Sequence, residues 1–215
     1  MSNSQTARFF DSYAHDFDSI YAGGKTPLHR LLNRYFRRSM FMRYERTLEA
    51  CAPAKGMNIL DVGCGPGHYS VALALMGADE VTGIDVAPAM LNVAREKALR
   101  AGVVDRCRFQ ATDFQDISTA DHYDFVILMG FMDYVASAGS VIDKAVSMAR
   151  RRALFSFPAH GGLLAWQRRL RYRRKAPLFM YSKDDLDRLF DGYPTQRVTK
   201  TRIARDYYVI VDKSL

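Results

Sequence analysis

The chain has 215 residues, of which 48% are hydrophobic and 25% are charged, as in a soluble globular protein, and its formal net charge is +8 because 31 basic residues outnumber 23 acidic ones. No apolar run approaches the roughly 18 residues that span a bilayer, and the N-terminus lacks the basic start and apolar stretch of a signal peptide. Three widely spaced cysteines, Cys51, Cys64 and Cys107, indicate neither a disulfide framework nor a zinc site, so we expect one cytoplasmic domain with reduced thiols and no metal.

Residues 1–56 precede the regular part of the chain and contain a helical pattern. Thr26 and Pro27 are typical of a helix cap and first turn, and apolar residues from Leu28 to Leu48 recur at spacings of three and four. We expect this segment to form an N-terminal helical lid over the carboxyl edge of a sheet.

Strand-like and helix-like segments alternate from Met57 onward. Helices are predicted over His68–Met76 and over Pro88–Gly102, where proline occupies a favoured first-turn position. This alternation is typical of an α/β fold in which helices cover both faces of a parallel sheet, with residues 57–158 as its core. The predicted strands are Met57–Val62, Val81–Asp85, Arg108–Thr112, Phe125–Met129 and Ala153–Phe157.

The C-terminal part departs from that alternation. Ala159–Tyr181 is an insertion that we expect to cap the carboxyl edge of the sheet, and Ser182 with Asp185 three residues later predicts a capped helix. Two strand-like stretches, "TQRVTKTRI" and "DYYVIVDKS", then end the segment 182–215 with only a short break between them. They pair as an antiparallel hairpin or lie apart in the sheet after a tight reversal.

Much of the basic excess lies in two clusters, Arg30–Arg46 and Gln167–Lys175. Such clusters fit a nucleic acid, a peripheral contact with an acidic membrane surface, or an anionic substrate. They equally fit arginines that solvate the outer faces of two helices.

The stretch "ILDVGCGPGHYSVALA" places a glycine-rich turn at the end of the first predicted strand. In an open parallel sheet ligands bind beyond the carboxyl ends of the strands. A dinucleotide fingerprint would read G-x-G-x-x-G, whereas the glycines here are Gly63, Gly65 and Gly67, with His68 where the third would stand. Pro66 has no N–H to offer a phosphate, so the loop does not fit a pyrophosphate.

Two carboxylates at the ends of predicted strands further limit the class of ligand that this loop would bind. Asp61 would repel a pyrophosphate but attract an ammonium or sulfonium group, so we expect a cationic cofactor, although the same side chain could simply bond its own turn. Asp85, at the end of the second predicted strand, lies where a carboxylate accepts both ribose hydroxyls of an adenosine.

Together, "ILDVGCGPGHYSVALA" and "VTGIDVAPAMLNVAREKA" resemble the first two motifs of the class I S-adenosylmethionine-dependent methyltransferases, and the order of elements over roughly residues 57–157 agrees. The resemblance implies S-adenosylmethionine as cofactor and a doubly wound, Rossmann-like sheet of seven strands whose last strand is antiparallel. It also implies that the glycines let the backbone approach the methionine part, that Asp61 faces its ammonium and that Asp85 holds the ribose.

The same resemblance extends to the third and fourth strands. In "QATDF" it implies that Asp113 faces the adenine amino group and that Phe114 packs on the ring. Val86 and Met90 would line the other side of the adenine. In "YDFVILMGFMDYV" it implies that Met129 and Gly130 lie near the sulfonium. The residues that we assign to the cofactor, including two lid tyrosines, are Asp61, Gly63, Cys64, Gly65, Gly67, Asp85, Val86, Met90, Asp113, Phe114, Met129, Tyr13 and Tyr21.

The opening "FFDSYAHDFDSIY" is similar to the lid helices of small-molecule methyltransferases of the ubiquinone and magnesium-protoporphyrin types. Aromatic faces stabilise a sulfonium as they do other cations, which makes Tyr13, Phe17, Tyr21 and Phe131 candidates for the wall of the methyl site. Each of them could equally be lid core.

Methyl transfer from a sulfonium needs alignment and exclusion of water, and a base helps when the acceptor is a hydroxyl. Asp133 is the best-placed candidate base, with Tyr134 and His160 as second choices. The porphyrin enzymes tend to have histidine and then tyrosine where this chain has Asp133 and Tyr134, which argues against a porphyrin substrate.

We therefore expect an enzyme that methylates an oxygen or nitrogen of a small-molecule acceptor, with an anionic acceptor as one option. An RNA or protein substrate is the first alternative, but the chain lacks an "NPPY"-like tetrad after the fourth predicted strand. A non-catalytic cofactor-binding partner protein would have an eroded glycine motif, and a nicotinamide dehydrogenase is disfavoured by Pro66 and Asp61. The sequence does not indicate an oligomeric state.

Overall fold

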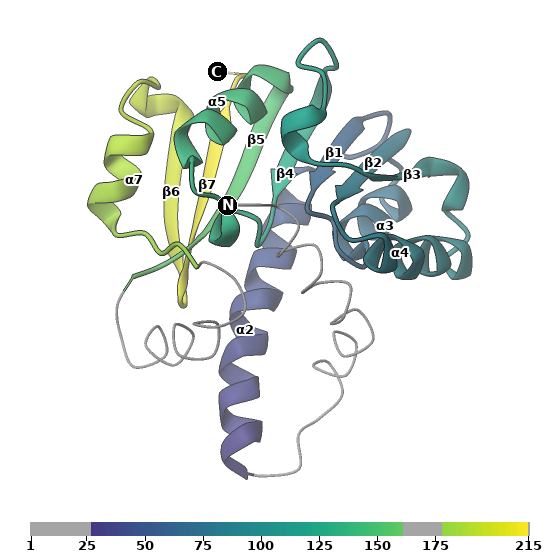
Figure 1. Cartoon of the computed structure of the whole chain (residues 1–215), viewed down its shortest axis with the longest axis horizontal. Helices are drawn as coiled ribbons and strands as arrows, with labels where there is room; N and C mark the ends of the chain where they lie inside the picture. Colours follow the sequence, from purple (N-terminus) through teal and green to yellow (C-terminus); the bar gives the residue numbers. More distant parts are fainter. Residues whose placement is uncertain (1–26, 161–177, 215) are drawn as a thin grey trace.

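The computed structural model describes residues 27–160 and 178–214, with side chains from residue 39 onward within these ranges. Its centre is a seven-stranded sheet (Figure 1). The strands are β1 (Asn58–Val62), β2 (Glu80–Asp85), β3 (Cys107–Ala111), β4 (Tyr123–Leu128), β5 (Ala149–Pro158), β6 (Val198–Ile203) and β7 (Asp206–Asp212).

The strand order is β3-β2-β1-β4-β5-β7-β6. All neighbouring pairs are parallel except the two that β7 makes, with β5 and with β6. The expected Rossmann-like sheet with an antiparallel last strand is therefore confirmed. The hairpin alternative for the two C-terminal strands is the one that the structure adopts, and β7 inserts between β5 and β6.

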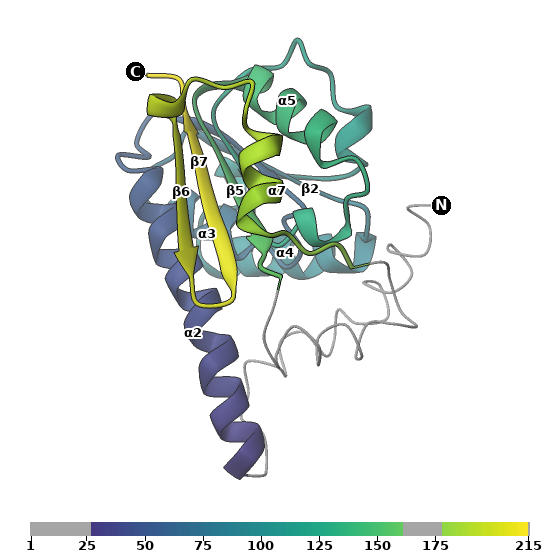
Figure 2. The same ribbon diagram turned by 90° about the vertical axis from the view of Figure 1, so that its left-hand side faces the viewer.

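Helices cover both faces of the sheet, as predicted (Figure 2). The helices α2, α3 and α4 share one apolar cluster with the sheet, and α5 and α7 share another with the opposite face. The adjacent residues Ile59 and Leu60 of β1 belong to different clusters because neighbouring side chains of a strand point to opposite faces. The helices are α2 (Pro27–Ala50), α3 (His68–Leu75), α4 (Pro88–Arg100), α5 (Ala138–Met148) and α7 (Lys183–Leu189).

Most predicted boundaries agree with the structure to within two residues, but β5 is an exception. It begins at Ala149 rather than Ala153, because two of the three arginines before Ala153 have carboxylate partners. Arg151 pairs with Asp124, and Arg152 Nε donates to Asp212 at 2.7 Å on the neighbouring strand.

Local sequence signals account for several helix starts. Pro88 occupies the first turn of α4. Ser182 and Asp185 form the predicted capping box of α7, with Ser182 Oγ accepting from the Asp185 backbone N–H and the Asp185 carboxylate accepting from the Ser182 N–H.

Helix α2 begins beyond the carboxyl ends of the strands and then runs along the sheet against the C-terminal hairpin of β6 and β7 (Figures 1 and 2). Its described side chains Ser39, Thr47 and Ala50 are buried. The predicted N-terminal helix is thus present over Pro27–Ala50, and its far end overhangs the edge where a ligand is expected. Within residues 27–160 and 178–214, no helix has the length and apolar character needed to cross a membrane.

Candidate functional site

The glycine turn between β1 and α3 forms a tight left-handed loop. Gly63, Gly65 and Gly67 have φ values of 66°, 51° and 71°, which side chains of L-residues rarely adopt. A Cβ on Gly63 would lie 2.8 Å from Phe131 Cδ2, and one on Gly67 would lie 2.8 Å from Ala94 Cβ. A Cβ on Gly65 would meet no protein atom within 4 Å, so this glycine faces open space.

The backbone N–H groups of this loop are already committed to the protein. The N–H of Cys64 donates to Ile84 O, that of Gly65 to Asp85 Oδ2 and that of Gly67 to Cys64 O, each at 2.9 to 3.0 Å. Pro66 has no N–H. Residues 64–67 therefore offer no free backbone donor to a phosphate, which agrees with the interpretation made from Pro66 alone.

Asp61 lies beneath the loop, and its side chain is only 1% exposed. The Ser70 hydroxyl donates to Asp61 Oδ2 at 2.6 Å, and the Ser70 backbone N–H also bonds the carboxylate. Asp61 thus replaces the side-chain cap that Gly67 cannot give to α3. Burial raises its pKa from 3.8 to about 7 against the lowering effect of the Ser70 bonds, and the charge of Asp85 adds to the increase. Its predicted contact with an ammonium stays a prediction.

Asp85 joins the loop to the start of α4. Its Oδ2 accepts from the Gly65 N–H and its Oδ1 accepts from the Ala87 N–H, both at 2.9 Å. The carboxylate is half-buried and lies at the carboxyl end of β2, as predicted. Beyond it, Val86 is half-buried and Met90 is buried against Ala87.

Asp113 and Phe114 follow β3. The Asp113 carboxylate accepts from the Gln115 N–H at 2.9 Å and caps a short 3-10 helix. The Phe114 ring is buried, packs edge to face on Phe131 with 6.3 Å between the ring centroids, and has Lys144 Nζ 5.1 Å from its centroid. Phe131 therefore links the Phe114 core to the glycine loop.

The turn after β4 starts one residue earlier than predicted, so Met129 lies just past the strand and is buried. Gly130 has a φ of 77°, and its N–H donates to Ser156 Oγ of β5 at 2.7 Å. The Arg43 guanidinium lies against the same turn, because a Cβ on Gly130 would be 3.5 Å from Arg43 Nη1.

Arg43 of α2 lies beside this turn, and it was not among the site residues predicted from the sequence. Its Nε donates to the Tyr69 hydroxyl at 3.2 Å, and its Nη1 donates to Ser156 Oγ at 3.4 Å. Burial acts to lower the pKa of Arg43, but Tyr69 and the carboxylates of Asp206 and Asp133 raise it above its ordinary value. The guanidinium is therefore a permanent positive charge at the carboxyl edge of the sheet.

A helical spacing in the sequence could have indicated Arg43. Ser39, Arg43 and Thr47 stand four residues apart and Ala50 three further on, which puts all four on one helix face. The apolar residues of α2 that recur at helical spacing lie at other positions. The side of the helix that faces the sheet carries a polar strip formed by Ser39, Arg43 and Thr47.

The candidate bases lie near this edge but in different surroundings. Asp133 is buried in the short 3-10 helix η3 (Met132–Tyr134), and Tyr134 is half-buried beside it. His160 is exposed, and its backbone N–H donates to Tyr181 O at 2.7 Å. Asp133 lies close enough to raise the pKa values of both Arg43 and Tyr181. Burial, together with the charges of Asp133 and Asp185, raises the pKa of Tyr181 to about 12.

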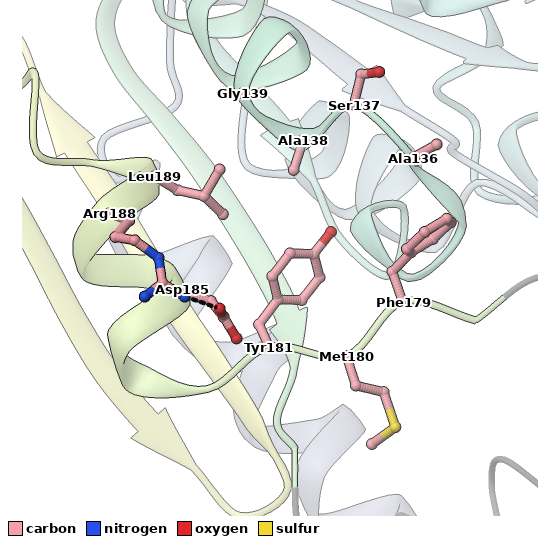
Figure 3. Close-up of a pocket in the computed structure, with 10 residues that line it drawn as sticks. All are labelled: Ala136, Ser137, Ala138, Gly139, Phe179, Met180, Tyr181, Asp185, Arg188 and Leu189. Atoms are coloured by element: carbon pink, nitrogen blue, oxygen red, sulfur yellow. Dashed lines mark hydrogen bonds and ion pairs between the residues drawn. The ribbon is translucent and has the colours of Figure 1, made fainter.

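An open pocket of about 560 Å³ adjoins the Asp133 turn (Figure 3). Two hydrogen bonds connect its wall to that turn: the Tyr181 hydroxyl donates to Met132 O at 3.2 Å, and the Phe179 N–H donates to Asp133 O at 2.8 Å. The Tyr181 ring occupies the centre of the view, facing the start of α5. The pocket is lined by Ala136, Ser137, Ala138, Gly139, Phe179, Met180, Tyr181, Asp185, Arg188 and Leu189.

Other predicted site residues lie outside the described residues. These are Tyr13, Phe17 and Tyr21 of the lid, together with the basic run Gln167–Lys175 of the insertion. In the part of the chain that the structure describes, no group of three or more His, Cys, Asp or Glu side chains could hold a metal ion.

Comparison with known proteins identifies relatives of this chain. The family model described as "Methyltransferase domain" matches residues 53–168, just over half of the chain. The ubiquinone biosynthesis O-methyltransferase of Bordetella avium is 35% identical over 111 residues, which cover 51% of this chain and 45% of that protein. The protein of the same name from Azorhizobium caulinodans is 35% identical over 149 residues, covering 67% of this chain and 57% of that protein. The chain spans about half the length of these curated relatives.

Among solved structures, magnesium protoporphyrin IX methyltransferase from Synechocystis PCC 6803, crystallised with SAH, superposes with a TM-score of 0.76 at 21% identity. The superposition covers 98% of both chains, so the two proteins share a fold.

Proposed function

Because this chain belongs to the methyltransferase-domain family, as the resemblance in its glycine and ribose motifs indicated, we propose that it transfers the methyl group of S-adenosylmethionine to an oxygen or nitrogen of a small-molecule acceptor. The observation that carries the proposal is the glycine loop. Its residues 64–67 have no backbone donor left for a phosphate, and Gly65 opens onto free space above buried Asp61. Such a loop suits the methionine part of a sulfonium cofactor better than a pyrophosphate.

The ribose and adenine would extend from the loop toward β2 and β3. Asp85 accepts from the Gly65 N–H and lies half-buried at the carboxyl end of β2, where its carboxylate would accept from the ribose hydroxyls. Asp113 and Met90 lie on the elements that follow these strands, which supports the predicted adenine site.

Arg43 supplies the charge that the methionine carboxylate requires. The guanidinium lies against the Gly130 turn, on the side of β4 where the resemblance puts the sulfonium. Its bonds to Tyr69 and Ser156 hold it in place before any ligand binds, which reduces the entropy lost on binding. We assign Arg43 to the donor carboxylate by charge and position.

The reaction is an in-line displacement. A bond forms between the acceptor atom and the methyl carbon as the carbon–sulfur bond breaks, its electron pair goes to sulfur to leave a neutral thioether, and the acceptor gives up its proton. The chain mainly has to align these atoms and exclude water. Asp133 would accept the proton of a hydroxyl acceptor, since its buried carboxylate lies between the Arg43 and Tyr181 regions.

The acceptor would enter at the carboxyl edge, between α2 and the pocket beside the Asp133 turn. That pocket has the volume of a small-molecule site and an aromatic wall formed by Phe179 and Tyr181. The relatives named ubiquinone biosynthesis O-methyltransferase support oxygen as the methylated atom.

The test is a calorimetric comparison of S-adenosylhomocysteine with NAD. We expect micromolar binding of the sulfur compound and none of NAD; micromolar NAD binding without a response to S-adenosylhomocysteine would overturn the proposal. Asp85→Ala should weaken the binding. A thermal-shift screen of phenols, hydroxybenzoates and amines against the S-adenosylhomocysteine complex would then identify acceptors for a turnover assay.

Calorimetric titrations at several salt concentrations distinguish a small-molecule acceptor from an RNA substrate. Binding of an RNA substrate would weaken steeply as salt rises, whereas binding of a small neutral acceptor would not.

A further inference from the structure

Strand β7 is linked to helix α2 near both ends of the strand, directly at one end and through Arg152 of β5 at the other. At the carboxyl edge of the sheet, the Ser39 hydroxyl donates to Asp206 Oδ2 at 2.7 Å. At the opposite edge, Asp212 holds Arg152, which in turn donates to Ala50 O at 2.8 Å. The two aspartates are the first and last residues of the same strand: Asp206 bonds Ser39 near the middle of α2, and Asp212 is linked through Arg152 to Ala50 at the end of the helix.

The pair at the carboxyl edge is the more deeply buried of the two. Ser39 is fully buried and Asp206 is 5% exposed, whereas the Asp212 and Arg152 side chains retain 17% and 34% of their exposure. Burying a carboxylate costs free energy. The burial of Asp206 beside the candidate site therefore suggests that this residue does more than join α2 to the sheet.

Asp206 also acts on Arg43. Ser39 and Arg43 stand one helical turn apart on the same face of α2, so a group that fixes one orients the other. The Asp206 charge is among the largest of the influences that favour the charged form of Arg43. Arg43 in turn donates to Ser156, which accepts the Gly130 N–H. One contact path therefore leads from β7 through α2 and β5 to the turn after β4.

We propose that Asp206 is a positioning residue for the donor site: it holds Ser39 and the charge of Arg43 so that the guanidinium lies against Gly130 when the methionine carboxylate arrives. The inference rests on the proposed function, because it gives Arg43 the donor carboxylate as its ligand. It adds a residue from the last strand, 167 positions away from Ser39 in the sequence, to the control of cofactor affinity.

Asp212 provides the matched control. Asp206→Asn and Asp212→Asn make the same chemical change at the two ends of β7: the first removes a charge that bonds α2 directly, and the second removes a charge that is linked to α2 only through Arg152. We expect both to lower the melting temperature. At a temperature well below both transitions, Asp206→Asn should weaken S-adenosylhomocysteine binding at least fivefold in calorimetry, while Asp212→Asn should change it less than twofold.

A double-mutant cycle tests the path through Arg43. In an Arg43→Met background, Asp206→Asn should weaken binding no further, because the group that it positions is gone. Ser39→Ala, which removes only a hydroxyl and disturbs the fold least, should reproduce part of the loss if Asp206→Asn does not fold.

The outcomes separate the two proposals. If the wild-type chain does not bind S-adenosylhomocysteine, the proposed function fails. If the wild-type chain binds and Asp206→Asn behaves like Asp212→Asn, or if its effect persists unchanged beside Arg43→Met, Asp206 is a structural residue only and the inference is wrong.

Discussion

Gly65→Ala tests the binding site that we assign to the methionine part of the cofactor. Gly65 has a φ of 51°, and an added Cβ would meet no protein atom within 4 Å. The substitution should therefore cost only the strain of a left-handed residue, about 1–2 kcal/mol, without a clash in the free protein. In the complex, the methyl group would occupy space that the ligand needs.

Gly56 provides the control, because it too has a positive φ, 76°, with no atom within 4 Å of an added Cβ. It precedes β1, whereas Gly65 follows it, so the two glycines lie at opposite ends of that strand. Gly56→Ala should carry the same strain. For a chain of this length, about 1–2 kcal/mol lowers the melting temperature by roughly 2–8 °C.

The assay is calorimetric titration with S-adenosylhomocysteine together with thermal unfolding of both variants. We expect similar losses of melting temperature, and a loss of affinity of tenfold or more, about 1.4 kcal/mol, for Gly65→Ala alone. Wild-type affinity in Gly65→Ala would refute the placement of the ligand over this loop. Equal loss of affinity in both variants would show that strain, rather than contact, controls binding.

Three further predictions concern stability and turnover. Gly67→Ala should destabilise the protein by about 1–3 kcal/mol more than left-handed strain alone, because its Cβ would lie 2.8 Å from Ala94 Cβ in α4; denaturant unfolding measures this, and a cost no greater than that of Gly56→Ala would contradict it. Because the pKa of Asp61 is raised on folding, the folded state binds its proton more tightly than the unfolded state, and the free energy of unfolding should fall by up to about 4 kcal/mol as pH rises from about 4 to about 7. Asp61→Asn should remove this pH dependence, at a pH-independent cost of about 1 kcal/mol for a lost hydrogen bond. An unchanged pH dependence in the variant would argue against the effect of burial on Asp61. Asp133→Asn should slow methyl transfer to a hydroxyl acceptor by about 10²–10⁴-fold and leave S-adenosylhomocysteine affinity within twofold; equal losses of both would refute a separate role as base.

Features set by neighbouring residues could be predicted from the sequence. The glycine loop, the carboxylate at the end of β2 and the cap of α7 each depend on a few consecutive positions, whose backbone geometry limits what they can form. The sequence shows that Pro66 has no N–H, and the structure adds that the N–H groups of Cys64, Gly65 and Gly67 all have acceptors within the protein.

Other features depend on the packing of distant segments, and only the tertiary structure decided them. β5 extends through a run of arginines because Asp124 and Asp212 on the neighbouring strands form ion pairs with Arg151 and Arg152. Arg43 bonds Ser156 of β5, 113 positions away, and its neighbour Ser39 bonds Asp206 of β7, 167 positions away, because α2 packs this face against the sheet. A sequence shows which side chains carry charge, but whether a charge is buried, and beside which partner, is set by the three-dimensional packing of the chain.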